Sequence, residues 1–167
     1  MTLTALVLLL SLSPSAAAAP ARARRARKAP ACRAQTVRTK AVMTLPGGKT
    51  LRVDVVDTPK EREIGLMCVR RMPKDYGMLF VFPAEMDLGF WMKHTLVPLD
   101  ILWIGADKTI TVIHPRLKAS TLDEPDSQVA TARGRGQYVL ELPAGAAARY
   151  GLKAGDALGF SVGIPLD

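Results

Sequence analysis

Short runs of apolar residues, separated by turn residues, make up most of the chain after residue 40. Leu51, Val53 and Val55 occupy every second position, and a Pro-Gly-Gly-Lys turn precedes them. This period of two predicts a hairpin of residues 42–45 and 51–56 with one face towards solvent. Further apolar or aromatic runs bounded by Gly, Pro or charged residues predict six more strands. They cover residues 78–82, 88–93, 100–104, 109–113, 138–142 and 157–164.

Two helices are predicted among these strands. Thr58 can cap a helix, Pro59 suits its first turn, and Glu61 can return the hydrogen bond, which is the pattern of a capping box. Apolar residues three and four positions apart follow, so this helix is predicted over residues 59–69, with Gly65 packed closely against a neighbour. An Ala-rich segment predicts a second, short helix over residues 144–150.

These elements predict one α+β domain. Seven or eight strands and two short helices favour a β-rich, mostly antiparallel sheet that is curled or barrel-like. Residues 105–108 are predicted to form a hairpin turn. Residues 115–136 are polar and weakly patterned, which predicts a loop of about twenty residues, and loops of that length are usually functional or disordered.

The beginning of the chain has a different composition. Residues 1–19 combine a short apolar run with a small-residue exit, which is typical of a secretory signal peptide. Residues 20–40 are predicted to be a basic linker rich in Ala and Pro, and residues 41–167 the single domain. The apolar run is too short to span a bilayer. We therefore expect an exported protein, periplasmic or secreted, with no transmembrane helix in the mature chain.

The net charge of +8 lies entirely before the predicted domain. Eight basic and no acidic residues occur between Arg22 and Lys40, whereas residues 41–167 hold 15 Lys or Arg and 15 Asp or Glu, and 15 minus 15 is zero. A nucleic-acid-binding domain would carry its basic residues on a folded face. The distribution argues against nucleic acid and suits a solvated linker that contacts anionic surfaces.

The chain has two cysteines, Cys32 and Cys68. In an exported protein an even number of cysteines favours a disulfide, which here would join the start of the ordered region to the end of the first helix. The alternative is that both cysteines are free thiols, with Cys68 buried as a small apolar side chain.

Several spaced motifs resemble those of the domain of unknown function 192 family. The resemblance runs in order over about residues 51 to 160, and it implies a small β-rich domain of bacteria and archaea, often behind a signal peptide or anchor, with no assigned activity. The family usually has Asn where this chain has His94, so a catalytic role of that imidazole would not be a family property. The matching motifs are Thr58-x-x-Glu61-Arg62-x-x-Gly65-Leu-Met67, Gly77-Met-Leu-Phe-x-Phe82, Phe90-Trp-Met-Lys93-x-Thr95-x-x-Pro98-Leu-Asp100-Ile101, Val139-Leu-Glu-Leu142-x-x-Gly145 and Gly155-Asp156.

The candidate site lies in the aromatic stretch of residues 77–104, which holds both tryptophans and three of the four phenylalanines. Polar residues beside a large apolar mass, where strands meet turns, are where a pocket would form. Trp91 could serve as a flat platform and Lys93 as part of a cationic wall for a small anionic or polyol ligand. Alternatively, Lys93 caps a strand end. The other candidate ligand-binding residues are Arg70, His94 and Asp100.

Two of these candidates have a structural interpretation as well. Asp100 could hold the turn of Thr95 to Pro98 through hydrogen bonds to backbone amides. His94 could be a surface turn residue. We assign no catalytic residue from the sequence, because no Gly-x-Ser-x-Gly motif and only two histidines occur.

The sequence predicts an accessory domain of the cell envelope that binds a small ligand or a partner protein. Its binding surface is predicted to be formed by Trp91, Lys93 and the loop after Pro115. An alternative is an envelope enzyme of hydrolase type that uses Lys93, His94 and Asp100. Another alternative is a copper(I)-binding protein, because five of the seven methionines fall between Met67 and Met92 and thioethers suit that ion. A purely structural partner-binding protein is a further class. No cofactor and no zinc site are predicted, since no Cys and His pairs occur at ligand spacing.

Overall fold

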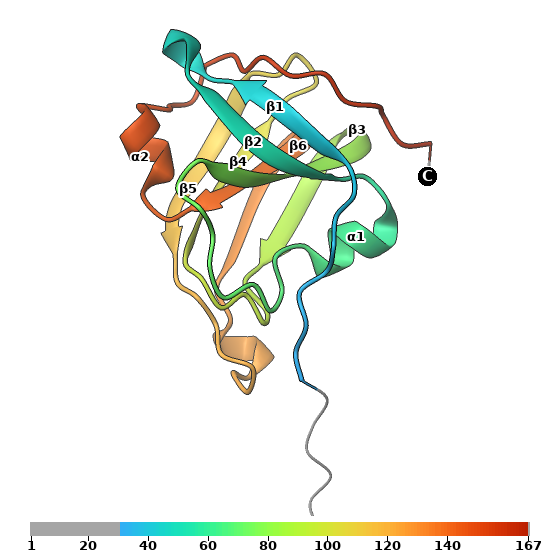
Figure 1. Ribbon diagram of the computed structural model, residues 1–167, viewed down its shortest axis with the longest axis vertical. Coiled ribbons are helices and arrows are strands. Elements are labelled where there is room, and N and C mark those ends of the chain that lie inside the picture. The colour runs from blue at the N-terminus through green and yellow to red at the C-terminus, as the bar shows by residue number, and fades with distance from the viewer. Residues whose placement is uncertain (1–30, 167) are drawn as a thin grey trace, which may run out of the picture. The chain divides into compact units, whose positions relative to one another are not determined.

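The computed structural model describes residues 31–166. The predicted signal peptide and the first part of the linker, residues 20–30, lie outside the described residues. Within the described part, a six-stranded sheet has the order β1-β2-β3-β6-β4-β5 (Figure 1). None of the described helices is long and apolar enough to cross a membrane.

The elements follow one another along the chain with short connections. The strands are β1 (Lys40–Thr44), β2 (Thr50–Val56), β3 (Tyr76–Trp91), β4 (Leu99–Ile104), β5 (Ile110–Leu117) and β6 (Thr131–Pro143). The helices are α1 (Pro59–Ile64) and α2 (Ala146–Tyr150), with two 3-10 turns, η1 (Pro46–Gly48) and η2 (Asp126–Gln128). The two α-helices lie on opposite sides of the sheet in Figure 1.

The sheet is not closed, which corrects the expected barrel-like arrangement, and it is mixed, with one parallel pair among mostly antiparallel ones. β2 and β3 are parallel because α1 forms a crossover between them, and the other neighbouring strands are antiparallel. The predicted hairpin of β1 and β2 is present, with Met43 opposite Leu51. β1 and β5 stand at the two edges of the sheet.

The described residues form six strands rather than seven or eight. The predicted strands 78–82 and 88–93 are one strand, β3, which continues through a register shift between Val81 and Met86. The predicted last strand makes only isolated bridges, from Gly159 to Thr44 and from Ala157 to Thr109. These bridges connect the C-terminal segment to the end of β1 and to the turn after β4, so the segment ties the two edges of the sheet without becoming a strand.

Both helices are shorter than predicted, and the geometry at Gly65 explains where α1 ends. Thr58 caps the helix as predicted, since Glu61 N donates to Thr58 Oγ1 at 3.3 Å. The Glu61 side chain returns a bond to the Thr58 hydroxyl at 2.9 Å, rather than to the backbone N–H as in a capping box. The helix ends at Ile64 because Gly65 leaves helical geometry, with φ 47° and ψ −130°. A Cβ at Gly65 would lie 3.0 Å from Phe80 Cζ, so the expected close packing at this glycine is confirmed.

The loop after β5 is also shorter than predicted. β5 continues to Leu117 and β6 begins at Thr131, because these residues extend the ladders onto β4 and onto the second half of β3. The remaining connection contains η2. It is stabilised by an internal hydrogen bond, in which Thr121 N donates to Glu124 Oε2 at 3.1 Å.

The sheet buries an apolar cluster on each face. The face towards α2, called the α2 face, carries Leu79, Leu102 and Leu140, which pack with Ala146 and Ala147 of the helix. The opposite face, called the α1 face, carries Phe80, Ile101, Trp103 and Val139, which pack with Leu66 after α1. Because side chains alternate along each strand, the buried apolar residues of a strand divide between these two clusters.

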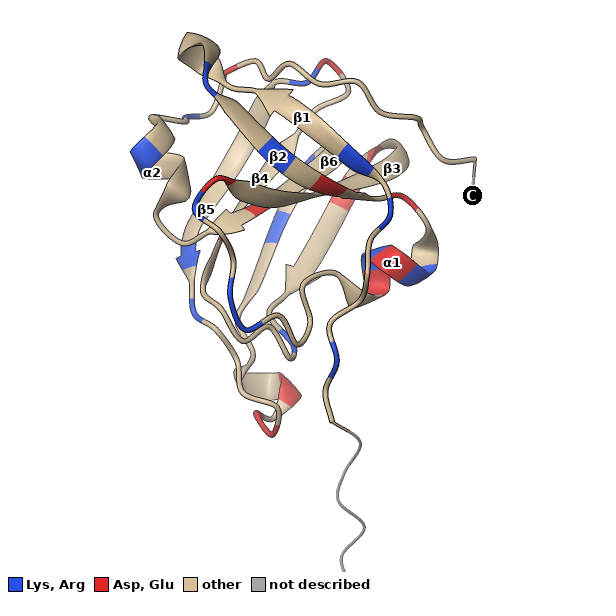
Figure 2. Cartoon of the chain, viewed as in Figure 1, with Lys and Arg blue, Asp and Glu red and all other residues tan. Residues whose placement is uncertain are grey.

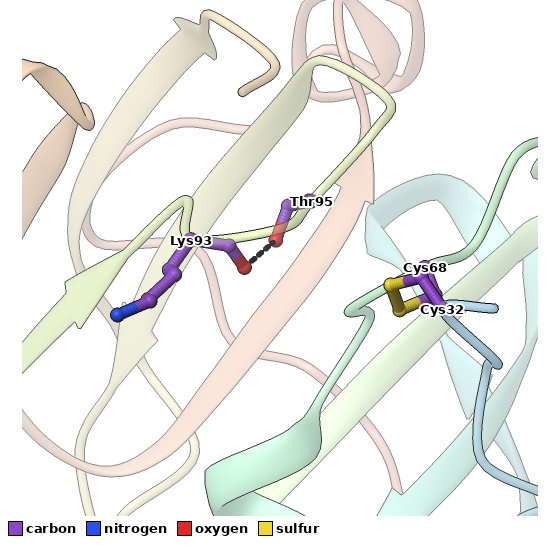
Figure 3. Close-up of a disulfide and its surroundings, with 4 residues drawn as sticks. All are labelled: Cys32, Cys68, Lys93 and Thr95. Carbon is purple, nitrogen blue, oxygen red and sulfur yellow. Dashed lines mark hydrogen bonds between the residues drawn. A yellow bond between two sulfur atoms is a disulfide. The ribbon is translucent and has the colours of Figure 1, made fainter. Parts of the chain in front are cut away.

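A disulfide joins Cys32 to Cys68, with the two Cα atoms 5.5 Å apart. Cys68 has a positive φ of 67°, and its backbone N donates to His94 O at 2.8 Å. The first described segment is therefore tied to the turn after α1, and that turn is bonded to the turn after β3. Figure 3 shows the disulfide together with Lys93 and Thr95.

Candidate functional site

Glu141 is an acidic residue buried in the middle of the sheet, with 5% of its surface exposed. It lies on β6 between Leu140 and Leu142, which both belong to the α2 face. Its register partners are Met78 on β3 and Ile101 on β4, which both pack on the α1 face. The carboxyl group therefore enters the α1 face among apolar side chains.

A small cavity lies on the α1 face beside this carboxyl group, with a volume of about 40 Å³. Glu141 Oε2 has no hydrogen-bond partner, and it is one of three buried side-chain atoms of the described residues in that state. The other two, Trp103 Nε1 and Ser120 Oγ, belong to residues that do not line this cavity. The lining residues that matter here are Arg62, Phe90, Trp91, Lys93, Thr95 and Glu141.

A wider hollow of about 300 Å³ shares part of this lining. It is bounded by Pro59 and Arg62 on one side and by Phe82, Phe90 and Trp91 on the other. Arg62, Glu63, Phe90 and Trp91 contribute to both spaces, so they are adjacent. We call the two spaces together the Trp91 cleft. Trp91 is 46% exposed, so its ring is available at the mouth.

Two cations lie at the aromatic walls of the Trp91 cleft. Lys93 Nζ lies 4.8 Å from the centre of the Trp91 ring and forms an ion pair with Asp126 at 2.9 Å. Arg62 lies 5.0 Å from the centre of the Phe82 ring, and its Nη1 donates to Val81 O at 3.0 Å. Asp126 belongs to η2, so the loop between β5 and β6 helps to position Lys93.

The turn after β3 sets the direction of Lys93. Thr95 N donates to Met92 O at 3.0 Å, which closes the turn. Thr95 is buried, and its hydroxyl donates to Lys93 O at 3.3 Å, the contact drawn as a dashed line in Figure 3. In the same figure the Lys93 side chain extends away from Thr95.

Burial raises the pKa of the Glu141 carboxyl to about 8, because an apolar surrounding penalises the ionised form. At neutral pH Glu141 is therefore mainly a neutral acid, which can donate a hydrogen bond through one oxygen and accept through the other. A buried acid with a shifted pKa, beside a cavity, is a candidate functional group.

Trp91 and Lys93 are the two sequence-predicted site residues that the structure places in this cleft. The structure places Asp100 outside this cavity, opposite Leu142 of the α2 face. Its carboxylate accepts hydrogen bonds from Arg116 N at 2.8 Å, Gly145 N at 3.0 Å and Ala147 N at 2.8 Å. Asp100 thus fixes the start of α2 and the end of β5. It accepts bonds from backbone amides, as predicted for its structural role, but the amides belong to these two segments and not to the turn of residues 95–98.

His94 and Arg70 do not line the cavity either. Arg70 is exposed in the segment after α1. His94 occupies the turn with φ 52°, a backbone conformation in which Asn, Asp and His are enriched. Backbone geometry therefore explains both the histidine here and the asparagine that is usual in the resembling family. Lys93, His94 and Asp100 do not converge into one catalytic group.

Glu141 is not among the residues predicted from the sequence, although one signal of its burial is present there. Tyr138-Val-Leu-Glu-Leu142 is an apolar run with a single charge in its centre. A strand buried on both faces has no solvent side for that charge, so the carboxyl group must be paired, neutral or directed into a cavity.

A larger hollow of about 520 Å³ lies beside β1, and its polar groups are already paired. Asp54 forms an ion pair with Lys40 and a hydrogen bond with the Tyr76 hydroxyl. Burial, followed by that hydrogen bond, raises the pKa of Tyr76. With its carboxylate satisfied, this hollow is a weaker candidate than the Trp91 cleft.

The described residues contain no group of three or more His, Cys, Asp or Glu side chains arranged to hold a metal ion. The methionines that suggested copper(I) are divided between environments. Met78 and Met92 are core residues of the α1 face, whereas Met86 is 45% exposed after the bulge of β3.

Charged residues of both signs are interspersed on α1 and on β1 and β2 (Figure 2).

The sequence model of the DUF192 family, described as Uncharacterized ACR, matches residues 41–160. No curated protein matches the chain. Two solved structures are similar in fold and sequence. One, a "putative transcription regulator" from Sinorhizobium meliloti 1021, is 37% identical with a TM-score of 0.63, over 75% of this chain and 97% of that one. The other, a protein of unknown function from Novosphingobium aromaticivorans DSM 12444, is 30% identical with a TM-score of 0.61, over 78% of this chain and 94% of that one.

Proposed function

The chain belongs to the uncharacterised DUF192 family, and we propose that it is a small-ligand-binding domain that works outside the cytoplasm. The observation that carries this proposal is the buried, unpartnered oxygen of Glu141 beside a cavity. A buried polar atom without a partner costs about 1 to 3 kcal/mol. A ligand that supplies the missing hydrogen bond would recover part of that cost.

The shape and lining of the Trp91 cleft support the same proposal. A space of about 300 Å³ with aromatic walls and a few polar groups is within the range of small-molecule sites. Trp91 offers a half-exposed ring, and Glu141 offers a polar group at depth. A ligand would place its apolar part on the rings and its polar end in the inner cavity.

Export is part of the proposal and is supported by two features. Residues 1–19 have the composition of a secretory signal peptide. The Cys32–Cys68 disulfide is a cross-link of the kind that persists in oxidising compartments. We place the domain in the cell envelope or the medium, as an accessory protein for a ligand that is present there.

An enzyme is the second candidate, and one observation favours it. A buried acid with a pKa of about 8 can give or take a proton near neutral pH. In that case Glu141, rather than the Lys93, His94 and Asp100 group, would be the acid, and turnover would be lost in Glu141→Gln while ligand binding remains.

A thermal-shift screen of the full chain tests the binding proposal. The panel contains carboxylates, sugars, peptidoglycan fragments and amines, without a thiol reductant so that the disulfide stays intact. Copper(I) is tested separately under anaerobic conditions, again without a thiol. A ligand at one hundred times its dissociation constant stabilises a protein by about 2.7 kcal/mol, or about 5 to 15 °C here.

The matched variants are Trp91→Ala and Val42→Ala. Both remove an exposed apolar side chain from a strand, but only Trp91 borders the cleft. We expect a shift that Trp91→Ala abolishes and Val42→Ala preserves. A panel without any Trp91-dependent shift would contradict the proposal.

A further inference from the structure

We infer that the ligand of the Trp91 cleft is a small carboxylate with an apolar body, whose carboxylate oxygen accepts a hydrogen bond from the carboxylic acid of Glu141. This inference rests on the proposed function and names the chemical class of the ligand. No bond is formed or broken, and the shared proton stays on Glu141.

The balance of donors and acceptors around the inner cavity favours an acceptor ligand. Glu141 in its neutral form can donate, and Arg62 and Lys93 carry only donor groups on their side chains. Glu63 is the anion of the lining, and its carboxylate is paired with Lys60 at 3.0 Å on the surface. Lys93 is paired with Asp126 and Arg62 with Val81 O. Among the described lining residues, the buried group left without a partner is therefore the Glu141 acid, and a ligand that brings an acceptor oxygen complements it.

A cationic ligand is disfavoured because the protein's own cations already occupy aromatic faces. Lys93 Nζ lies over the Trp91 ring at 4.8 Å, and Arg62 lies over the Phe82 ring at 5.0 Å. An ammonium ligand would have to displace one of them to form a cation–π contact.

The sizes of the two spaces separate a carboxylate from a polyol. An engineered cavity of about 150 Å³ holds one benzene ring, so the inner cavity of about 40 Å³ holds a group of a few atoms and no sugar ring. A carboxylate group fits that space. The adjacent hollow of about 300 Å³, with Pro59, Phe82 and Phe90 in its lining, suits an aryl or short alkyl body.

The charged and titratable groups around Glu141 come from every element that packs near it. Arg62 and Glu63 approach from α1, and Lys93 from the turn after β3. Tyr76 on β3 is close enough for the Glu141 charge to raise its pKa further. On the same face, Asp54 of β2 lies beyond Met78 and His114 of β5 lies beyond Ile101.

A consequence for pH follows from this arrangement. With a pKa of about 8, Glu141 loses its proton at higher pH, and two carboxylates would then face each other in a buried space. Since only the protonated form can donate, affinity for a carboxylate should fall about tenfold for each pH unit well above 8. A neutral or cationic ligand would show no such loss.

The experiment measures dissociation constants of the full chain by calorimetry at pH 7, 8 and 9. The probes are phenylacetate and short-chain carboxylates, each with its amide, alcohol and amine of matching shape. We expect the carboxylates to bind best at pH 7, to bind several-fold more weakly at pH 9, and to depend on Trp91.

Two variants at position 141 isolate the acid. Glu141→Gln keeps a neutral donor of similar shape, so it should bind the carboxylate with an affinity that no longer changes between pH 7 and 9. Glu141→Leu removes the donor and should weaken binding at least tenfold at pH 7, while Val42→Ala should match the unmodified chain.

The outcomes separate the two proposals. Trp91-dependent binding of an alcohol or amine in preference to the carboxylate would overturn the ligand class and leave the binding function in place. Carboxylate binding with the same pH profile in Glu141→Gln would overturn the role of Glu141. If no probe bound in a Trp91-dependent manner, both proposals would fall.

Discussion

At the scale of the residue, Glu141 folds with a proton that the unfolded chain does not hold at neutral pH. Its pKa rises from 4.5 to about 8 on folding, so the folded state binds more protons between these values. Stability must then decrease as pH increases through this window and become level above about pH 8. Neutral pH 7 lies 2.5 pH units above the unfolded pKa of 4.5. The free energy of unfolding at pH 7 is therefore about 3 kcal/mol lower than it is below pH 4.5, as far as Glu141 alone decides it.

We therefore expect Glu141→Gln to gain stability relative to the unmodified chain by about 1.4 kcal/mol for each unit between pH 5 and pH 8. Denaturant unfolding at several pH values measures this slope. Glu141→Leu should have the same slope with a different offset, because it also cannot titrate. Parallel curves for the unmodified chain and both variants would show that Glu141 is not the buried acid.

The same residue scale marks the limit of what the sequence could predict for the site. Trp91 and Lys93 could be identified because an exposed aromatic and a basic residue at a strand end are local features. Asp100 and Glu141 look alike in sequence, each a single acid in an apolar strand. Only the register assigns Asp100 to the α2 face, where amides satisfy it, and Glu141 to the α1 face, where one oxygen has no partner.

At the scale of the element, β6 passes so close to β4 that a side chain is excluded. A Cβ at Gly136 would lie 2.6 Å from Ile104 O and 3.0 Å from Ile104 N, which are backbone atoms. Neither strand can move aside without breaking the β4–β6 ladder. Glycine at this position is thus required by the distance between backbones.

Gly136→Ala should lower the free energy of unfolding by about 1 to 3 kcal/mol, the usual cost of overpacking. The control is Gly89→Ala in β3, where the nearest atom to the added Cβ is Arg133 Cγ at 4.0 Å. That substitution should be neutral or slightly stabilising. Urea unfolding compares the two, and equal effects would contradict the packing argument.

Local patterns predicted the elements better than they predicted how the elements join. The β1–β2 hairpin and the Thr58 cap of α1 are set by residues a few positions apart, and both are present. The continuity of β3 and the length of β6 depend on pairing between residues more than forty positions apart, such as Phe90 and Ala132. Alternation cannot report such pairs, which is why the number of strands was overestimated.

At the scale of the whole molecule, the disulfide links the stability of the domain to the compartment in which it works. It joins Cys32 to Cys68 across a sequence separation of 36. Gln35, three residues after Cys32, bonds Glu61 O at 3.1 Å and Gly65 O at 2.9 Å. The segment before β1 is thereby held against α1, whose neighbouring residues Leu66 and Met67 line the inner cavity.

Reduction should lower the free energy of unfolding by about 3 to 4 kcal/mol, since the unfolded chain regains the entropy that a closed loop of this length removes. Denaturant unfolding with and without a thiol reductant measures the loss, and the Cys32→Ser, Cys68→Ser double variant should match the reduced chain and ignore the reductant. Reduction should also weaken ligand binding, because Cys68 N bonds His94 O in the turn that carries Lys93. If the chain were equally stable with the disulfide oxidised and reduced, the disulfide would no longer support an oxidising compartment. The composition of residues 1–19 would then be the one remaining support for export.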